Sequence, residues 1–313
     1  MIKYLFLTFV LIGNFFSLNA QTQKTPFSFL GTNSSARASA LSGAFVSLIN
    51  DATGLIYNPA LLYTVEEKKI SSTFIKNVLD INSGNIVYIR PKYDFGVIGM
   101  AVVYNSYGDF EKRNSEGELQ GGSFSGSDMS FNLSYANQID TNFFYGATVK
   151  FLYTGLADNS TSSLAFDFGL LYKYDDRTNI GLSVLHSGMQ LTKFNGEYYS
   201  LPLDIRLGFN HRLKGLPVLF NFSFHHLADN ENKFFDKFSH FSVGGEIYFG
   251  KYLIGRIGYD NKIRTEISPD LDRGLSGFSG GIGIKLTDFN VDYSINQFGS
   301  STVIHRFSLY LNY

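Results

Sequence analysis

The sequence predicts an all-β protein, a transmembrane antiparallel β-barrel of about fourteen strands. Three observations predict it: long segments in which apolar and polar residues alternate, connections that are either very short or long and polar, and aromatic residues near the segment ends. The composition agrees, because only 17% of the 313 residues are charged while 31 are Phe and 20 are Tyr. Soluble domains usually carry about 25% charged residues.

The balance of charges and the lack of cysteine exclude several classes of protein. Lys and Arg number 26 against 27 Asp and Glu, which gives a net charge of -1. Because nucleic-acid binding depends on an excess of cationic residues, we expect no nucleic-acid partner. With no cysteine, the chain has no disulfide framework, thiolate metal site, cysteine nucleophile or acylated lipoprotein cysteine.

The first twenty residues have the layout of a secretory signal peptide. Lys3 gives a positively charged start, residues 4–16 form an almost unbroken apolar run, and residues 17–20 form a cleavage site before the polar Gln21. The apolar run is shorter than the ~20 residues that a membrane-spanning helix needs. We therefore expect residues 1–20 to be a signal peptide and the protein to reach the cell outer membrane.

Residues 21–66 are expected to form a separate N-terminal segment, and residues 67–313 the barrel. Residues 34–45 are rich in small side chains, favour a short helix and allow close packing against a wall. Asn58-Pro59 then breaks the helix, since proline lacks an N–H donor and restricts the residue before it.

From about residue 70 onward the sequence alternates with a period of two. In residues 127–138, for example, Phe131 and Leu133 lie on one face of the strand and Ser130 and Asn132 on the other. An even number of such segments allows closure without edges. Fourteen are expected, at residues 70–77, 84–91, 95–107, 127–138, 142–155, 162–174, 178–186, 201–213, 216–227, 238–249, 252–262, 276–286, 289–297 and 303–313.

Two architectures produce such alternation. In a soluble sandwich the apolar face points inward to a second sheet, whereas in an outer-membrane barrel it points outward to lipid and encloses a polar lumen. The barrel is favoured because the segments exceed the ~5–6 residues typical of soluble strands. It is also favoured because short connections at residues 140–141 and 175–177 contrast with long polar ones at residues 108–127 and 187–200.

Residues 21–66 carry the most distinctive motifs. They are FSFL at residues 27–30, SARASALSGAFV at residues 35–46 and DATGLIYNPAL at residues 51–61. Together they resemble the opening of the PorV/PorQ family, in which an AR-x-x-ALGGA run precedes an acidic residue and NPA-x-L; Ser42 replaces the first glycine of the pair here. DINSG at residues 80–84 and the chain length are more similar to the PorQ branch. The residues that match the family motif are Ala36, Arg37, Ala40, Leu41, Gly43, Ala44, Asp51, Asn58, Pro59, Ala60 and Leu61.

This resemblance implies a FadL-like barrel of fourteen strands in which residues 21–66 form a short N-terminal helical hatch in the lumen. It also implies a role in the type IX secretion system of Bacteroidota. In that system PorV is associated with a sortase-like transpeptidase, and PorQ with a surface protein that engages anionic lipopolysaccharide. The resemblance thus implies a subunit without chemistry of its own, which docks the attachment complex for secreted proteins.

A hatch also agrees with the physical requirements of such a barrel. A barrel of fourteen strands is wider than one that its own wall side chains can fill, so an insert must plug it. Arg37 in that insert needs a carboxylate partner, because an unpaired charge taken from water is costly. Asp167, Asp204, Glu246 and Asp292 all qualify. The expected lumen charges, which either line a pore or hold the hatch, are Asp167, Lys173, Asp204, Arg206, Glu246, Lys285 and Asp292.

No residue pattern indicates an active site. There is no local serine motif or paired-carboxylate cluster. His225 and His226 are neighbours on an expected strand and would face opposite ways, which disfavours joint metal ligation. The glycines at 280, 281 and 283 lie in an alternating strand, where glycine allows close approach rather than phosphate binding. We expect no enzyme, cofactor or metal ion.

Two functions remain open from the sequence. The first is a docking subunit of type IX secretion, which would use polar loops at residues 109–126 and 229–237. Its partners would be outer-membrane lipid, other proteins of the attachment complex, and lipopolysaccharide or a hydrophobic ligand. The alternative is a FadL-like channel for small hydrophobic molecules, for which the Phe-rich residues 220–224 would provide a lateral path.

Overall fold

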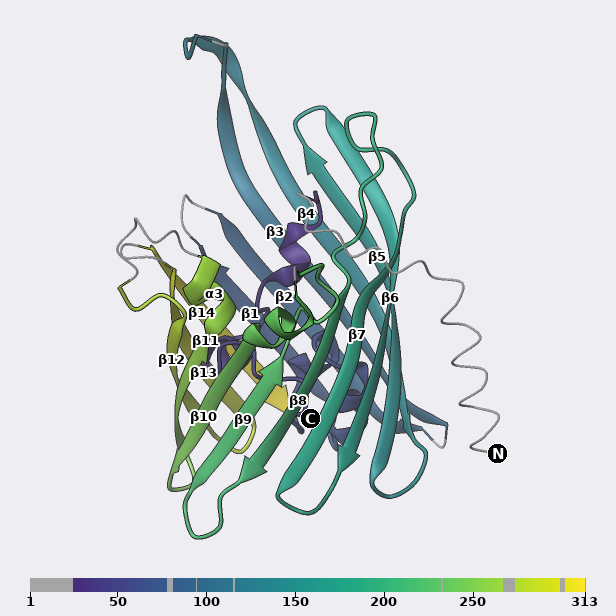
Figure 1. Cartoon of the computed structure of the whole chain (residues 1–313), viewed down its shortest axis with the longest axis vertical. Helices are drawn as coiled ribbons and strands as arrows, with labels where there is room; N and C mark the ends of the chain where they lie inside the picture. Colours follow the sequence, from purple (N-terminus) through teal and green to yellow (C-terminus); the bar gives the residue numbers. More distant parts are fainter. Residues whose placement is uncertain are drawn as a thin grey trace.

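The chain forms a closed antiparallel barrel in the computed structural model, which describes residues 25–77, 81–93, 95–114, 116–231, 233–266, 274–298 and 302–312. The expected signal peptide lies outside these residues. Each strand pairs with its neighbours in sequence (Figure 1), and β1 closes against β14 with Lys69 opposite Asn312. The strands are β1 Lys69–Lys76, β2 Asn82–Tyr93, β3 Gly96–Arg113, β4 Leu119–Gln138, β5 Phe143–Leu156, β6 Asn159–Lys173, β7 Thr178–Gln190, β8 Asp204–Arg212, β9 Val218–Phe224, β10 Phe241–Phe249, β11 Leu253–Asp260, β12 Phe278–Lys285, β13 Phe289–Phe298 and β14 Thr302–Asn312.

In most strands the polar face points inward and the apolar face outward. In β4, Ser130 and Asn132 are buried, whereas Phe131 and Leu133 are 46% and 54% exposed. A soluble sandwich would bury the phenylalanine and leucine instead. The pattern therefore confirms the predicted transmembrane barrel, whose outer surface contacts lipid.

The wall is uneven in height because the strands differ greatly in length. β3 and β4 have 18 and 20 residues and project as a hairpin above the rest of the barrel in Figure 1, whereas β9 has only 7. The long polar loop expected at residues 108–127 is therefore wrong, since most of it is this hairpin, stabilised by stacking of Phe110 on Phe124 with ring centroids 5.3 Å apart. The loop expected at residues 187–200 is likewise shorter, because β7 continues to Gln190.

The hatch lies inside the barrel, where it appears in purple and dark blue in Figure 1. It contains four short helices: η1 Ser28–Gly31, α2 Ala36–Ala40, η2 Ala52–Ile56 and η3 Pro59–Thr64. α2 packs against β11 to β14, and η3 packs against β3 to β6, so the hatch spans the lumen. Its apolar side chains are buried against the wall in several small clusters rather than in one core.

Side-chain caps explain where three of the hatch helices begin. The Ser35 hydroxyl accepts the Ala38 N–H, the Asp51 carboxylate accepts the Thr53 N–H, and the Asn58 amide oxygen accepts the Ala60 N–H. Each cap satisfies a backbone donor that the helix itself leaves unpaired.

Helix α2 is shorter than the helix expected over residues 34–45. It stops because Ser42 and Gly43 adopt left-handed φ angles of 52° and 83°. The Gly43 N–H donates to the Ala38 carbonyl at 2.8 Å, which closes the end of the helix.

Two further short helices lie at the rim, on the side of the long strands. They are η4 Phe234–Ser239, between β9 and β10, and α3 Asn261–Glu266, which directly follows β11. Within the described residues, none of the helices combines the length and apolarity needed to cross a membrane.

Candidate functional site in the barrel lumen

Inward-facing glycines allow the hatch to lie directly against the strands. A Cβ atom on Gly146 would come within 2.5 Å of Pro59, and one on Gly281 within 2.6 Å of the Ala40 side chain. The close approach predicted for the glycine-rich stretch of β12 is thus confirmed. Hatch atoms also lie within 3.0 Å of the Cβ positions of wall residues Gly99, Gly169, Gly181, Gly244 and Gly258.

Asn58 ties the second half of the hatch to itself and to the wall. Its side-chain amide donates to the Val46 carbonyl in the hatch at 2.8 Å and to the Leu170 carbonyl in β6 at 3.0 Å, while its oxygen caps η3. Asn58 is fully buried, and so are the motif neighbours Ala60 and Leu61. Because the buried Asn58 amide makes all of these hydrogen bonds at once, it holds this part of the hatch in a single position against the wall.

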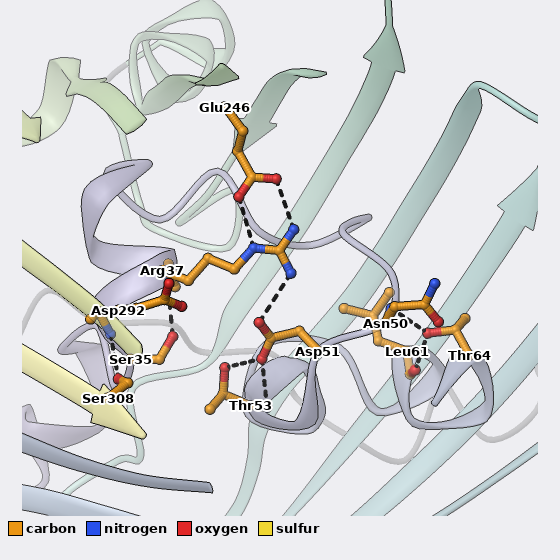
Figure 2. A network of polar contacts seen from close by, with 12 residues as sticks. Ser35, Arg37, Asn50, Asp51, Thr53, Leu61, Thr64, Glu246, Asp292 and Ser308 are labelled. Carbon is orange, nitrogen blue, oxygen red and sulfur yellow. Dashed lines mark hydrogen bonds and ion pairs between the residues drawn. The ribbon is translucent and has the colours of Figure 1, made fainter. Parts of the chain in front are cut away.

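Arg37 is the main electrostatic link between hatch and wall, and Figure 2 shows its partners. Its Nε and Nη2 donate to the two carboxylate oxygens of Glu246 in β10 at 2.8 and 2.7 Å. Its Nη1 donates to Asp51 in the hatch at 3.1 Å. Of the four carboxylates that the sequence left open, Glu246 is therefore the one that pairs with Arg37.

A second arginine extends this network along the wall. Arg256 in β11 donates from Nε to Glu246 and from Nη1 to Asp292 in β13, both at 2.7 Å. The resulting chain, Asp51–Arg37–Glu246–Arg256–Asp292, holds two cations and three anions, and we call it the latch network. Such two-point arginine–carboxylate pairs are strong and geometrically specific.

The other expected lumen charges occupy different positions. Asp167 pairs with Lys150 at 2.6 Å, and Asp204 pairs with Arg206 at the same distance. Both pairs lie in the wall, and among the described residues neither contacts a carboxylate or cation of the hatch. Lys173 lies over the Phe144 ring, 4.9 Å from its centroid.

The lumen also contains three cations that were not expected from the sequence, Lys150, Arg256 and Arg306. All three are buried, and Arg306 in β14 donates to the Asn33 carbonyl of the hatch at 3.0 Å. The alternation does indicate that these side chains point inward, because Lys150, for example, lies on the same face of its strand as Thr148. A count of cations on the polar face of every strand would have found them.

An open cavity of about 590 Å³ lies between the hatch and the short turns of the barrel. We call it the vestibule. Its charged side includes Asp51, Lys69 and Lys285, and its apolar side includes Leu219 and Ile254. This volume is within the range of ~300–1,000 Å³ that small-molecule sites occupy.

Three histidines gather at the opposite end of the lumen. His226 has a left-handed φ of 57°, so it does not alternate with His225, and the two rings are only 5.2 Å apart. The expectation that they face opposite ways is therefore wrong. The His240 ring lies 6.5 Å from that of His225. Among the described residues, no group of three or more His, Asp or Glu side chains has a geometry that could hold a metal ion.

Comparisons with known proteins support the fold. No protein-family model matches the sequence, and no curated protein matches it. Among solved structures, the chain is similar to the Pseudomonas putida toluene transporter TodX, with a TM-score of 0.62, 13% identity, and coverage of 89% of this chain and 98% of TodX. It is also similar to the CymD monoaromatic hydrocarbon channel, with a TM-score of 0.61, 11% identity, and coverage of 90% and 98%.

A FadL homologue from Pseudomonas aeruginosa gives the same result, with a TM-score of 0.58, 13% identity, and coverage of 90% of this chain and 98% of the homologue. The chain therefore has a FadL-like barrel fold that extends over almost the whole length of these channels. At such low identity the likeness concerns the fold.

Proposed function

We propose that the protein is an outer-membrane channel for small hydrophobic molecules that the hatch closes at rest. The proposal rests mainly on its similarity in fold to channels described as carrying monoaromatic hydrocarbons and toluene. Residues 1–20 would direct export, and lipid would surround the wall. The docking role in secretion, which the sequence favoured, has less support. The channel, which was the alternative, is therefore placed first.

The geometry of the lumen supports a gated passage rather than an open pore. The hatch fills the barrel between the histidine end and the vestibule, and the latch network fixes it to β10, β11 and β13 through Glu246, Arg256 and Asp292. A hydrophobic molecule would have to displace part of the hatch to reach the vestibule. Leu219 and Ile254 would then offer it apolar surface beside the charged lining.

Uptake by cells tests this proposal. Cells that produce the protein should accumulate radiolabelled toluene at an initial rate several-fold above cells that produce an unrelated outer-membrane barrel of similar size. The unrelated barrel controls for general disturbance of the membrane. Equal rates in the two strains would overturn the proposal.

A docking subunit of type IX secretion remains the second candidate. The observations that favour it are the hatch motifs shared with the PorV/PorQ family and the β3–β4 hairpin, which extends well above the rest of the wall and offers a surface to partners. Such partners would be attachment-complex proteins or lipopolysaccharide. Deletion of the gene, followed by assays of toluene uptake and of surface attachment of secreted proteins, separates the two candidates. Lost attachment with unchanged uptake would favour docking.

A further inference from the structure

The barrel wall is too low at β9 to cross the apolar part of a membrane by itself. β9 has 7 residues, which at about 3.3 Å per residue extend for roughly 23 Å. With the usual strand tilt of ~40°, this gives a height of about 18 Å, whereas the apolar band of outer-membrane barrels is ~25 Å tall. The connection that follows β9, residues 225–240, therefore begins at a depth where lipid surrounds the protein.

This connection presents a cluster of phenylalanines on its outer side. Phe234 and Phe235, at the start of η4, are 67% and 80% exposed. Phe238 packs edge-to-face on Phe224, the outward-facing last residue of β9, with ring centroids 5.3 Å apart. The Phe234 ring lies 5.6 Å from that of Phe238, so η4 is on the lipid side of the wall.

The cluster continues the aromatic surface of the neighbouring strands. Phe224 contacts Phe222 in β9, with ring centroids 4.8 Å apart, and Phe222 stacks on Phe241 in β10 at 5.9 Å. Phe241 in turn lies 6.4 Å from Tyr259 in β11. One row of outward rings thus leads from the barrel wall onto η4 without a polar break.

The inner side of the same connection is polar and holds it in place. His225 faces Asp260 of β11 across 3.4 Å, and Asp229 pairs with Lys262 of α3 at 3.0 Å. The Lys237 ammonium donates to the Leu227 carbonyl at 3.2 Å. Within the described residues 225–231 and 233–240, the inner side is therefore polar, and the outer side carries the phenylalanines together with the exposed charges of Lys233 and Asp236.

We propose that η4 inserts into the outer leaflet and that Phe234, Phe235 and Phe238 contact its acyl chains, completing the lipid-facing wall where β9 ends. Acyl chains fit this surface because it is apolar, because it joins the lipid-facing surface of β9 and β10, and because it lies at the depth that the short strand leaves uncovered. Exposed phenylalanines of this extent in water would be costly, at about 25 cal/mol per Å² of apolar surface.

The cysteine-free sequence makes a direct test simple. A single Phe235→Cys variant, labelled with the environment-sensitive fluorophore NBD, is reconstituted into phosphatidylcholine–phosphatidylglycerol vesicles. Phe131→Cys on the outer face of β4 serves as the lipid control, and Glu116→Cys at the turn of the β3–β4 hairpin serves as the water control. Folding of each variant is checked by heat-modifiable mobility.

The label at position 235 should have blue-shifted emission like that of the label at position 131. Phospholipids with doxyl groups near the glycerol should quench the label at position 235 at least half as strongly as the label at position 131. Emission and quenching equal to those at position 116 would overturn the proposal. If the Phe235 variant does not fold, Phe234→Cys gives the same two readouts with the same two outcomes.

Discussion

Replacement of Glu246 by glutamine tests the latch network most specifically. The variant keeps the size and shape of the side chain but removes its charge. The Glu246 carboxylate is fully buried and accepts hydrogen bonds from Arg37 at 2.8 and 2.7 Å and from Arg256 at 2.7 Å. In the variant, an amide nitrogen faces a guanidinium donor, and each arginine keeps only one carboxylate.

The magnitude follows from these contacts. Hydrogen bonds to charged groups contribute about 1.5–3 kcal/mol each, and removal of one partner of a buried ion pair costs about 3–5 kcal/mol. We therefore expect E246Q to make local opening of the hatch easier by about 3–5 kcal/mol. Since about 1.4 kcal/mol corresponds to a tenfold change, hatch amides should exchange about 10² to 10⁴ times faster.

Hydrogen exchange followed by mass spectrometry measures this directly on peptides from residues 36–64. The matched control is Glu111→Gln, because Glu111 pairs with Arg113 at 3.0 Å in the exposed hairpin. Exposed pairs contribute about 0–1 kcal/mol, so this variant should leave hatch exchange unchanged. Equal hatch exchange in E246Q and E111Q would refute the latch.

One further outcome is expected. Gly146→Val should displace η3, because its Cβ would lie 2.5 Å from Pro59. Gly245→Val should be tolerated, because the nearest atom to its Cβ, in the Ile257 side chain, is 4.0 Å away. Equal protection of the hatch from trypsin in both variants would contradict this packing.

The alternation of apolar and polar residues was sufficient to predict the barrel. In a membrane-spanning strand, the face toward lipid must be apolar and the face toward the lumen is polar, so the sequence indicates which face is which. Residues such as Ser130 and Phe131 face the sides that the sequence indicates. The same signal failed beyond the membrane. Between residues 108 and 127 both faces of the hairpin meet water, so paired strands carry no apolar face to distinguish them from a loop.

The sequence reduced the possible carboxylate partners of Arg37 to four but could not identify the correct one. Parity places Asp167, Asp204, Glu246 and Asp292 on the inner side, yet it does not say which strands lie opposite α2. That depends on how the hatch is oriented within the closed barrel, which is a tertiary property. The capping roles of Asp51 and Asn58 were similarly hidden, although each directly precedes a turn of helix.

Uptake through a barrel with a reducible hatch cross-link tests the central claim most directly. The hydroxyl oxygens of Ser42 in the hatch and Ser279 in β12 are 2.7 Å apart, so a disulfide between cysteines at these positions would pin the hatch to the wall. If small hydrophobic molecules pass by displacing the hatch, toluene uptake by the double variant should be lost when it is oxidised and restored by a reductant, with either single variant unaffected. Uptake that is the same in the oxidised and reduced states would contradict the account.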